Sequence, residues 1–207
     1  MTEEEAQVRL DVQRETLEGL ERFVQLLSGE NERQNLVSRG TLTDVWGRHI
    51  LDSAQLLRFA PHSGSWIDLG TGAGFPGLIV AALWQGDVTL VEARKLRAAF
   101  LQQAAELLDL QRPPTIICSK VEAVPVRRFD VISARAFAPL DKLLRLGLPF
   151  STGETIWILP KGRNAKSELD AARASWQGEF RIEPSLTDAE AGIIVARGVK
   201  PKGKKGR

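Results

Sequence analysis

The sequence predicts an α/β fold: a mostly parallel sheet of seven strands, covered by helices and ended by an antiparallel hairpin, with a helical cap at the N-terminus. Three observations predict it. Residues 1–60 carry apolar side chains at helical spacing. Five short apolar runs then alternate with helical stretches, which is typical of a parallel sheet with helices on both faces. The last two strand-like runs are separated only by TDAEA, which is too short for a crossover helix and therefore predicts a hairpin.

The expected elements follow in order along the chain. One helix is expected over residues 3–33 and a second from about Thr43 to Ala60, where Pro61 ends it. Strands are expected at 66–69, 88–92, 115–118, 129–134 and 155–160, and the hairpin comprises FRIEPSL (180–186) and GIIVARG (192–198). Helical stretches between them are expected at 78–84, 94–109, 121–124, 139–146 and 165–176. The chain is thus expected to consist of a cap (1–60), an α/β domain (61–199) and a basic tail (200–207).

The composition limits the class of protein. Of the 207 residues, 43% are hydrophobic and 26% are charged, which is ordinary for a globular chain with a single core. No apolar run is long enough to span a membrane, and the acidic start MTEEEAQVRLDVQRE lacks the apolar stretch of a secretory signal. One cysteine and two histidines give no basis for a metal site. A cytoplasmic protein is expected.

Positive charge is concentrated at the C-terminus. The formal net charge is +2, yet the last eight residues, KPKGKKGR, hold five basic side chains and no acidic one. Such a tail either contacts nucleic acid or is a solvated end. Lys202, Lys204 and Lys205 are therefore candidate RNA contacts.

The stretch SWIDLGTGAGFPG (65–77) predicts a strand that runs into a glycine-rich turn, the usual place for a ligand in an open α/β sheet. Residues 72–77 fit the G-x-G-x-x-G pattern of dinucleotide sites, and residues 70–74 fit the G-x-G-x-G pattern associated with S-adenosylmethionine (SAM). Both interpretations place an acid that binds ribose at the end of the second strand, where Glu92 stands. A turn without a ligand is the third interpretation, but so many glycines are costly in a mere connector.

Asp68 favours SAM over a dinucleotide. A carboxylate two residues before the first glycine repels a pyrophosphate, whereas it suits the sulfonium and the α-amino group of SAM. A strand–helix alternation that ends in a hairpin is also typical of SAM-dependent methyltransferases. Asp68, Gly72 and Gly74 are accordingly assigned to the cofactor site.

Five stretches together resemble one known family. They are NLVSRGTLTDVWGRHILDSAQLL (35–57), WIDLGTGAGFPGLIVA (66–81), VEARKLRAAFL (91–101), DVISARAFAPLDKLL (130–144) and LPKG (159–162). The sequence resembles the RsmG (GidB) family, bacterial guanine-N7 methyltransferases of small-subunit ribosomal RNA. The resemblance implies the class I SAM-dependent methyltransferase fold, SAM as cofactor, and guanine 527 of the 16S rRNA as the target.

The resemblance also implies site residues. It places SAM contacts on Gly70 and Phe75 of the turn, and on Glu92 at the end of strand two with Ala93 and Arg94 after it. It also places contacts on the pair after strand three, Val121 and Glu122, where valine replaces the family's usual alanine. The arginine of the A-R-A stretch is Arg135. It is expected to orient SAM or the guanine, or to form only a salt bridge. No general base is expected, because guanine N7 has a free lone pair.

Further basic residues are candidates for the RNA. Arg48 and His49 lie one turn before Asp52, so they either face the RNA or form local i,i+4 and i,i+3 pairs with that carboxylate. Lys161 and Arg163 follow strand five and either hold phosphates or are solvated. The expected partner is 16S rRNA or the small ribosomal subunit, and a monomer is the default.

Three other functions remain open at this point. An NAD-linked oxidoreductase fits the glycine spacing, but the chain has no tyrosine and neither histidine follows a predicted strand. A second alternative is a SAM methyltransferase that acts on another RNA, a protein or a small molecule. Only the basic tail and the arginines near the site argue against it, since they favour an RNA substrate. A non-enzymatic RNA-binding protein is opposed by the intact glycines, Asp68 and Glu92.

Overall fold

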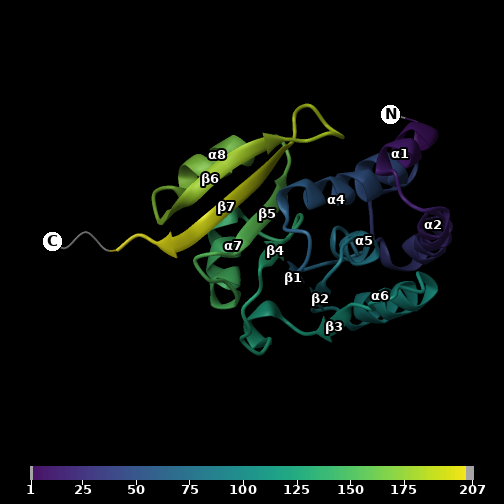
Figure 1. Ribbon diagram of the computed structural model, residues 1–207, viewed down its shortest axis with the longest axis horizontal. Helices are drawn as coiled ribbons and strands as arrows, with labels where there is room; N and C mark the ends of the chain where they lie inside the picture. Colours follow the sequence, from purple (N-terminus) through teal and green to yellow (C-terminus); the bar gives the residue numbers. More distant parts are fainter. Residues whose placement is uncertain (1, 204–207) are drawn as a thin grey trace.

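The computed structural model describes residues 2–203 as a sheet of seven strands with helices on both faces (Figure 1). The strands are β1 (Ser65–Leu69), β2 (Asp87–Glu92), β3 (Thr115–Cys118), β4 (Val131–Ser133), β5 (Ile156–Lys161), β6 (Trp176–Pro184) and β7 (Gly192–Pro201). Their order is β3-β2-β1-β4-β5-β7-β6. The first five strands pair in parallel, and β7 pairs antiparallel with β5 and β6. The predicted parallel sheet with a terminal hairpin is confirmed.

Helices cover the two faces unequally. One face carries α5 (Gly77–Leu83), α6 (Lys95–Leu107) and the N-terminal helices, and the other carries α7 (Leu140–Gly147) and α8 (Ala165–Ala172). The N-terminal segment comprises α1 (Glu3–Leu10), α2 (Arg14–Gln34), α3 (Arg39–Leu42), η1 (Trp46–Leu51), α4 (Asp52–Ala54) and η2 (Gln55–Phe59). Two short 3₁₀ turns complete the fold, η3 (Val121–Ala123) and η4 (Leu148–Phe150). None of the helices within residues 2–203 combines the length and the apolar character needed to cross a membrane.

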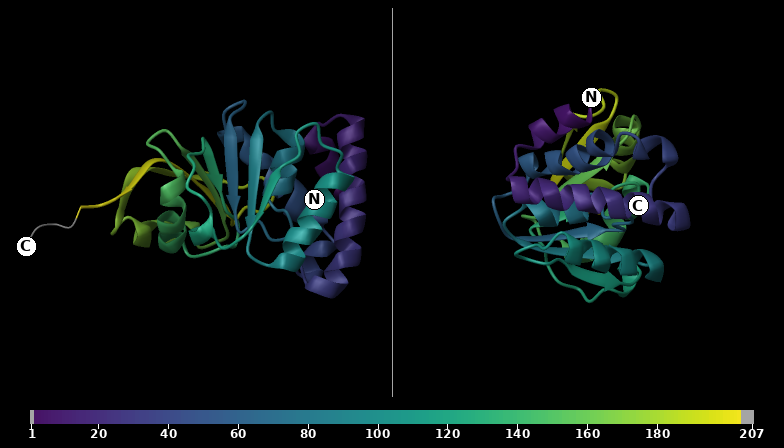
Figure 2. Two further views of the ribbon diagram at one scale, coloured as in Figure 1. Left: turned by 90° about the horizontal axis from the view of Figure 1, so that it is seen from below. Right: turned by 90° about the vertical axis from the view of Figure 1, so that its right-hand side faces the viewer.

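Side chains on successive strand residues point to opposite faces, and this alternation builds two cores. In β1, Trp66 belongs to the core beneath the N-terminal helices, whereas Ile67 and Leu69 belong to the core beneath α7 and α8. The buried residues of α2 recur at helical spacing and include Leu20, Phe23 and Leu27. The helical cap therefore shares one continuous core with the sheet. Figure 2 shows α2 beside α6, at the end of the molecule opposite the C-terminus.

The N-terminal helices differ from the prediction in continuity. The helix expected over residues 3–33 is two helices, because Asp11 takes a left-handed conformation with φ 46° and caps α1. The helix expected from Thr43 to Ala60 is divided, and its central part η1 is a π-helix. Nothing in the spacing of apolar residues distinguishes a π-turn from an α-turn.

The C-terminal boundaries also shift. The helix expected over 165–176 ends at Ala172, and Trp176 opens β6 instead, since its ring is buried in the second core. Strand β7 continues through Lys200 and Pro201, two residues past the expected boundary of the tail. Lys204 and Lys205 lie outside the described residues.

We expect the cap to be integral to the stability of the fold. Phe23 is fully buried, and its ring centroid lies 5.7 Å from that of Phe75 and 6.3 Å from that of Phe100. Phe23→Ala should lower the free energy of unfolding by roughly 3–5 kcal/mol, measured by denaturant titration, because it leaves a cavity in the shared core. Val8→Ala, at a position that is 73% exposed, is the control and should change it by less than about 0.5 kcal/mol. A loss below about 1 kcal/mol for Phe23→Ala would show that the cap does not support the sheet.

Candidate active site

Two cavities open at the carboxyl ends of the parallel strands, where the strand order reverses between β1 and β4. The smaller one, about 510 Å³, follows β1, β2 and β3, and we call it the cofactor cavity. The larger one, about 830 Å³, lies between the N-terminal helices, the end of β5 and the loop that joins β6 to β7, and we call it the substrate cavity. Ala136, Phe137 and Ala138 line both. These three residues are the wall between the two cavities.

The glycine turn lies at this wall. Gly70 has φ +70°, and a Cβ there would collide with the ring of Phe137. A side chain at Gly70 would therefore displace the aromatic ring as well as strain the backbone. Ala136, just before Phe137, also has a positive φ of 51° without being glycine, so the wall is held in a conformation that L-residues rarely adopt.

Asp68 supports the turn from below. Its carboxylate is fully buried and accepts hydrogen bonds from the Ser133 hydroxyl at 2.6 Å, from the Gly77 N–H at 3.1 Å and from the Thr71 hydroxyl. Burial raises its pKa to about 6, although these hydrogen bonds and the charge of Arg135 oppose the shift. Both oxygens accept hydrogen bonds inside the fold and Asp68 lines neither cavity, so its contact with the cofactor stays a prediction.

Glu92 stands where a ribose contact is expected. It lines the cofactor cavity, and its two carboxylate oxygens accept from the Gly72 N–H at 3.0 Å and the Arg94 N–H at 2.8 Å. Ala93 and Arg94 line the same cavity, as do the η3 residues Val121 and Glu122. Glu92 keeps unused lone pairs for hydroxyl donors, and Val121 offers a buried apolar wall for a purine. The residues therefore fit the adenosine part of SAM.

The other residues of the turn differ in the space around them. An added Cβ at Gly72 would meet nothing closer than 3.9 Å, whereas at Gly74 it would lie 2.5 Å from Leu78 in α5. Phe75 is 4% exposed and lines neither cavity. Its ring stacks on that of His49 at 4.8 Å. The ring therefore packs under the cap, and the contact of Phe75 with SAM that the resemblance implies stays a prediction.

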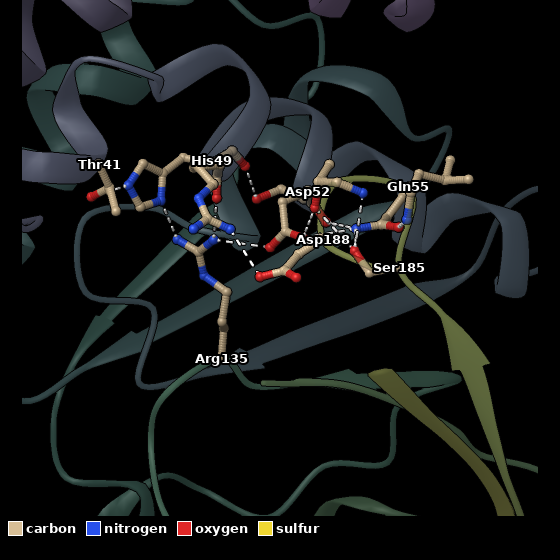
Figure 3. A network of polar contacts seen from close by, with 11 residues as sticks. Thr41, His49, Asp52, Gln55, Arg135, Ser185 and Asp188 are labelled. Atoms are coloured by element: carbon tan, nitrogen blue, oxygen red, sulfur yellow. Dashed lines mark hydrogen bonds and ion pairs between the residues drawn. The ribbon is translucent and has the colours of Figure 1, made fainter. Parts of the chain in front are cut away.

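Arg135, at the end of β4, joins the cap to the sheet (Figure 3). One guanidinium nitrogen donates to the Asp52 carboxylate at 3.2 Å and to the Arg48 carbonyl, and another donates to Nδ1 of His49 at 2.8 Å. Burial lowers the pKa of this guanidinium, and Asp52 opposes the shift. Its carbon also lies 5.2 Å from the centroid of the Phe75 ring. Arg135 lines the substrate cavity and not the cofactor cavity, so of its two expected roles the geometry favours orienting the guanine over orienting SAM.

His49 is held neutral beneath the surface. Because the Arg135 guanidinium can only donate, Nδ1 of His49 accepts, and Nε2 carries the proton toward the Thr41 hydroxyl at 2.9 Å. Burial, together with the charges of Arg135 and Arg48, lowers the His49 pKa to about 3. His49 is 8% exposed and both ring nitrogens are bonded internally, which favours the alternative of a docking contact between the cap and the sheet, and its contact with RNA stays a prediction. The expected i,i+3 pairing with Asp52 is also absent from the contacts of residues 2–203.

The remaining basic candidates are engaged by carboxylates or by backbone. Arg48 pairs with Asp188 of the β6–β7 loop at 3.0 Å, and not with Asp52 one turn away. Lys161 donates to the Glu168 carboxylate at 2.9 Å and to the Ala138 carbonyl at 3.0 Å, so it supports the wall between the cavities. Its side chain is only 9% exposed and already has a carboxylate partner, and a contact of Lys161 with phosphates stays a prediction. Arg163 is exposed and pairs with Glu190, and Lys202 donates to the Arg173 carbonyl.

Sequence reasoning missed the loop between β6 and β7 and the aromatic wall. Thr187 donates to Asp52 at 2.7 Å, and Gln55 contacts both Ser185 and the Leu186 N–H, so the loop is bonded to the cap (Figure 3). The sequence TDAEA (187–191) indicates a turn and gives no sign of a contact with the cap. Phe137 stands within the ARAFAPL stretch, two residues after Arg135, and this position is the one clue that the sequence offers. Among residues 2–203, no group of three or more His, Cys, Asp and Glu side chains is arranged to hold a metal ion.

Comparison with known proteins identifies the family. The family model GidB, described as rRNA small subunit methyltransferase G, matches residues 16–194. The chain belongs to this family. It is 50% identical over 218 residues to the ribosomal RNA small subunit methyltransferase G of Zymomonas mobilis, with 99% of this chain and 98% of that protein covered. It is 53% identical to the protein of the same name from Novosphingobium aromaticivorans, with coverage of 95% and 89%. The resemblance drawn from the five stretches is confirmed, and so is the methyltransferase class.

Solved structures support the fold. A ribosomal protein L11 methylase from Lactobacillus delbrueckii superposes with a TM-score of 0.58 at 16% identity, covering 75% of this chain and 79% of that one. A mutant of MtNAS in complex with S-adenosylmethionine gives 0.57 at 14% identity, with coverage of 87% and 74%. At such identities the likeness concerns the fold alone. The class I methyltransferase fold is confirmed, and with the family it establishes SAM as the cofactor.

The buried Asp68 predicts a pH-dependent stability. Its pKa is about 6 when folded, above the value of about 3.9 in an unfolded chain, so the native state binds the proton more tightly. Stability must then fall as pH rises from about 4 to about 6, and the fall is complete above the folded pKa. The free energy of unfolding of the wild type minus that of Asp68→Asn should drop by roughly 2 kcal/mol between about pH 4 and about pH 7.

Denaturant unfolding of both proteins across this range measures the difference, from which the titration of all shared groups cancels. A difference that rises with pH would show that the three hydrogen bonds outweigh burial and depress the pKa.

Proposed function

We propose that the protein transfers the methyl group of SAM to N7 of a guanine in small-subunit ribosomal RNA. The guanine would enter the substrate cavity, and SAM would bind in the cofactor cavity. When bound, SAM supplies an electrophilic methyl group on a sulfonium sulfur. The observation that carries the proposal is the shared wall at Ala136, Phe137 and Ala138, because it makes the two cavities direct neighbours. Methyl transfer needs an approach of about 3–3.5 Å between the reacting atoms, which only adjoining cavities allow.

The side chains of the substrate cavity suit a nucleophile that needs no deprotonation. Asp52 is paired with Arg135, Asp188 with Arg48 and Glu168 with Lys161, so each carboxylate of the lining is already engaged by a cation. His49 is neutral, but its one accepting nitrogen receives the Arg135 donor. Guanine N7 carries a free lone pair in neutral RNA. The chain therefore has to orient the base, and this favours N7 over exocyclic or hydroxyl positions, which must lose a proton.

The names of the relatives support RNA of the small subunit as the substrate. The substrate cavity, at about 830 Å³, is large enough for a nucleobase turned out of its strand. A guanine in a single-stranded loop avoids most of the cost of unstacking. We further propose that the cap (1–60), the catalytic domain (61–199) and the tail act together as a cytoplasmic monomer, whose partner is 16S rRNA or the small subunit.

Methyl transfer should occur at one guanine of small-subunit RNA. The RNA is taken from cells that lack the enzyme, both naked and as assembled subunits, and incubated with labelled SAM. Chemical cleavage at N7-methylated guanine then maps the product. A single labelled guanine is the expected result. Tight SAM binding without transfer to either substrate would leave the cofactor but reject the RNA target, and transfer to another atom would reject the N7 assignment.

Arg135 should orient the base and contribute little to SAM binding. Charge-assisted hydrogen bonds are worth about 1.5–3 kcal/mol, so Arg135→Ala should lower the rate at saturating SAM and RNA by roughly 10- to 100-fold. SAM affinity, measured by calorimetry, should stay within about threefold of wild type, because Arg135 does not line the cofactor cavity. Thermal unfolding controls for the lost contacts to the cap. Full activity, or a loss confined to SAM affinity, would contradict this role.

A further inference from the structure

Four basic side chains gather around the mouth of the cofactor cavity, and we call them the basic rim: Arg94, Arg97, Lys120 and Lys142. They come from separate places in the chain, namely the start of α6, its first turn, the residue before η3, and α7. Three of them are exposed and Arg97 is half-buried. None of the four forms an ion pair with any of residues 2–203. They differ in this from Arg48, Lys161 and Arg163, which all have carboxylate partners.

The charge lining the two cavities differs accordingly. Around the cofactor cavity the four rim cations face two carboxylates, Glu92 and Glu122, which leaves an excess of two positive charges. The Glu92 carboxylate is moreover bonded to backbone N–H groups. The substrate cavity is lined by three basic and three acidic side chains, so its lining is neutral.

The cofactor does not account for this excess. SAM carries a sulfonium, an ammonium and one carboxylate, so it is itself a net cation. Its carboxylate can neutralise at most one member of the rim, and Arg97 is the one nearest the glycine turn, with a guanidinium nitrogen 3.9 Å from the position of a Cβ on Gly72. The other rim cations would repel the bound cofactor. At most one rim cation is thus neutralised by SAM, and the others remain available to an anionic ligand.

We propose that the basic rim binds backbone phosphates of the RNA strand whose guanine occupies the substrate cavity. This rests on the proposed function and assigns the two parts of a nucleotide to different surfaces. The neutral base enters the substrate cavity, whose lining is neutral. The charged backbone lies on the basic rim, on the other side of the shared wall. Phosphate contacts position an RNA and supply most of the salt dependence of its binding.

The test is the salt dependence of RNA binding, not activity. Lys120→Gln with Lys142→Gln removes the two rim lysines, one just before η3 and one in α7. Binding of small-subunit RNA from cells that lack the enzyme is measured by filter retention at several salt concentrations. We expect the dissociation constant to rise about tenfold or more near physiological salt, and the slope of its logarithm against that of salt to become shallower by about 1.4, or about 0.7 for each single-strand phosphate contact. SAM affinity should stay the same or increase.

Two controls sharpen the result. Arg9→Gln with Arg14→Gln removes the same charge from exposed residues that line neither cavity, and it should leave the slope unchanged. Lys120→Arg with Lys142→Arg keeps the charge and should keep the wild-type slope. The proposal would be overturned if the salt slope of the glutamine pair were unchanged, or if the remote pair lost RNA affinity equally. It would also be overturned if the glutamine pair lost only SAM affinity, or if the arginine pair lost RNA affinity as well. A wild type that binds RNA with the expected slope but methylates no N7 would reject the proposed function and leave the rim supported.

Discussion

The carboxylate of Asp68 lies buried beneath the glycine turn, where it accepts hydrogen bonds from a strand, a turn and a helix at once. Its partner Ser133 belongs to β4, so the same carboxylate joins the two strands between which the sheet reverses its order. Burying an acid is costly, and its raised pKa reflects this cost. The arrangement persists because each oxygen has a partner. The position of Gly70 against Phe137, and hence the wall between the cavities, depends on this one group.

The substrate cavity is assembled from parts of the chain that have no local reason to meet. Arg48 and Asp52 come from the cap, Arg135 from the end of β4, and Thr187 and Asp188 from the hairpin loop, and ion pairs or hydrogen bonds link them across 83 to 140 residues of sequence. Each partly exposed pair contributes little alone. As a network around the half-buried Arg135 they close one side of the cavity and leave its lining neutral. The cap and the hairpin are thus walls of the substrate cavity as well as additions to the sheet.

The sequence was sufficient for those features that local patterning determines. Strand–helix alternation predicted the parallel sheet, TDAEA predicted the hairpin, and the glycine turn with Glu92 predicted the cofactor cavity. It failed where a long-range partner outcompeted a local one. Arg48 and Asp52 stand at i,i+4 spacing, but such a pair is worth only about 0.2–0.5 kcal/mol, and both side chains found partners elsewhere in the fold. The same limit applies to Asp68: its hydrogen bond from Ser133 of β4 spans 65 residues of sequence, so the residues next to Asp68 do not reveal it.

The uneven distribution of charge makes physical sense for a reaction that moves a positive charge. Methyl transfer neutralises the sulfonium in the cofactor cavity and leaves a cationic base in the substrate cavity. Before transfer, the cationic cofactor faces a lining with two excess positive charges, which weakens its binding. Phosphates on the basic rim would remove that repulsion, so RNA and SAM would each strengthen the binding of the other by the same factor. The enzyme would then hold its cofactor most tightly when the guanine is already beside the wall at Phe137, which is when the methyl group is needed.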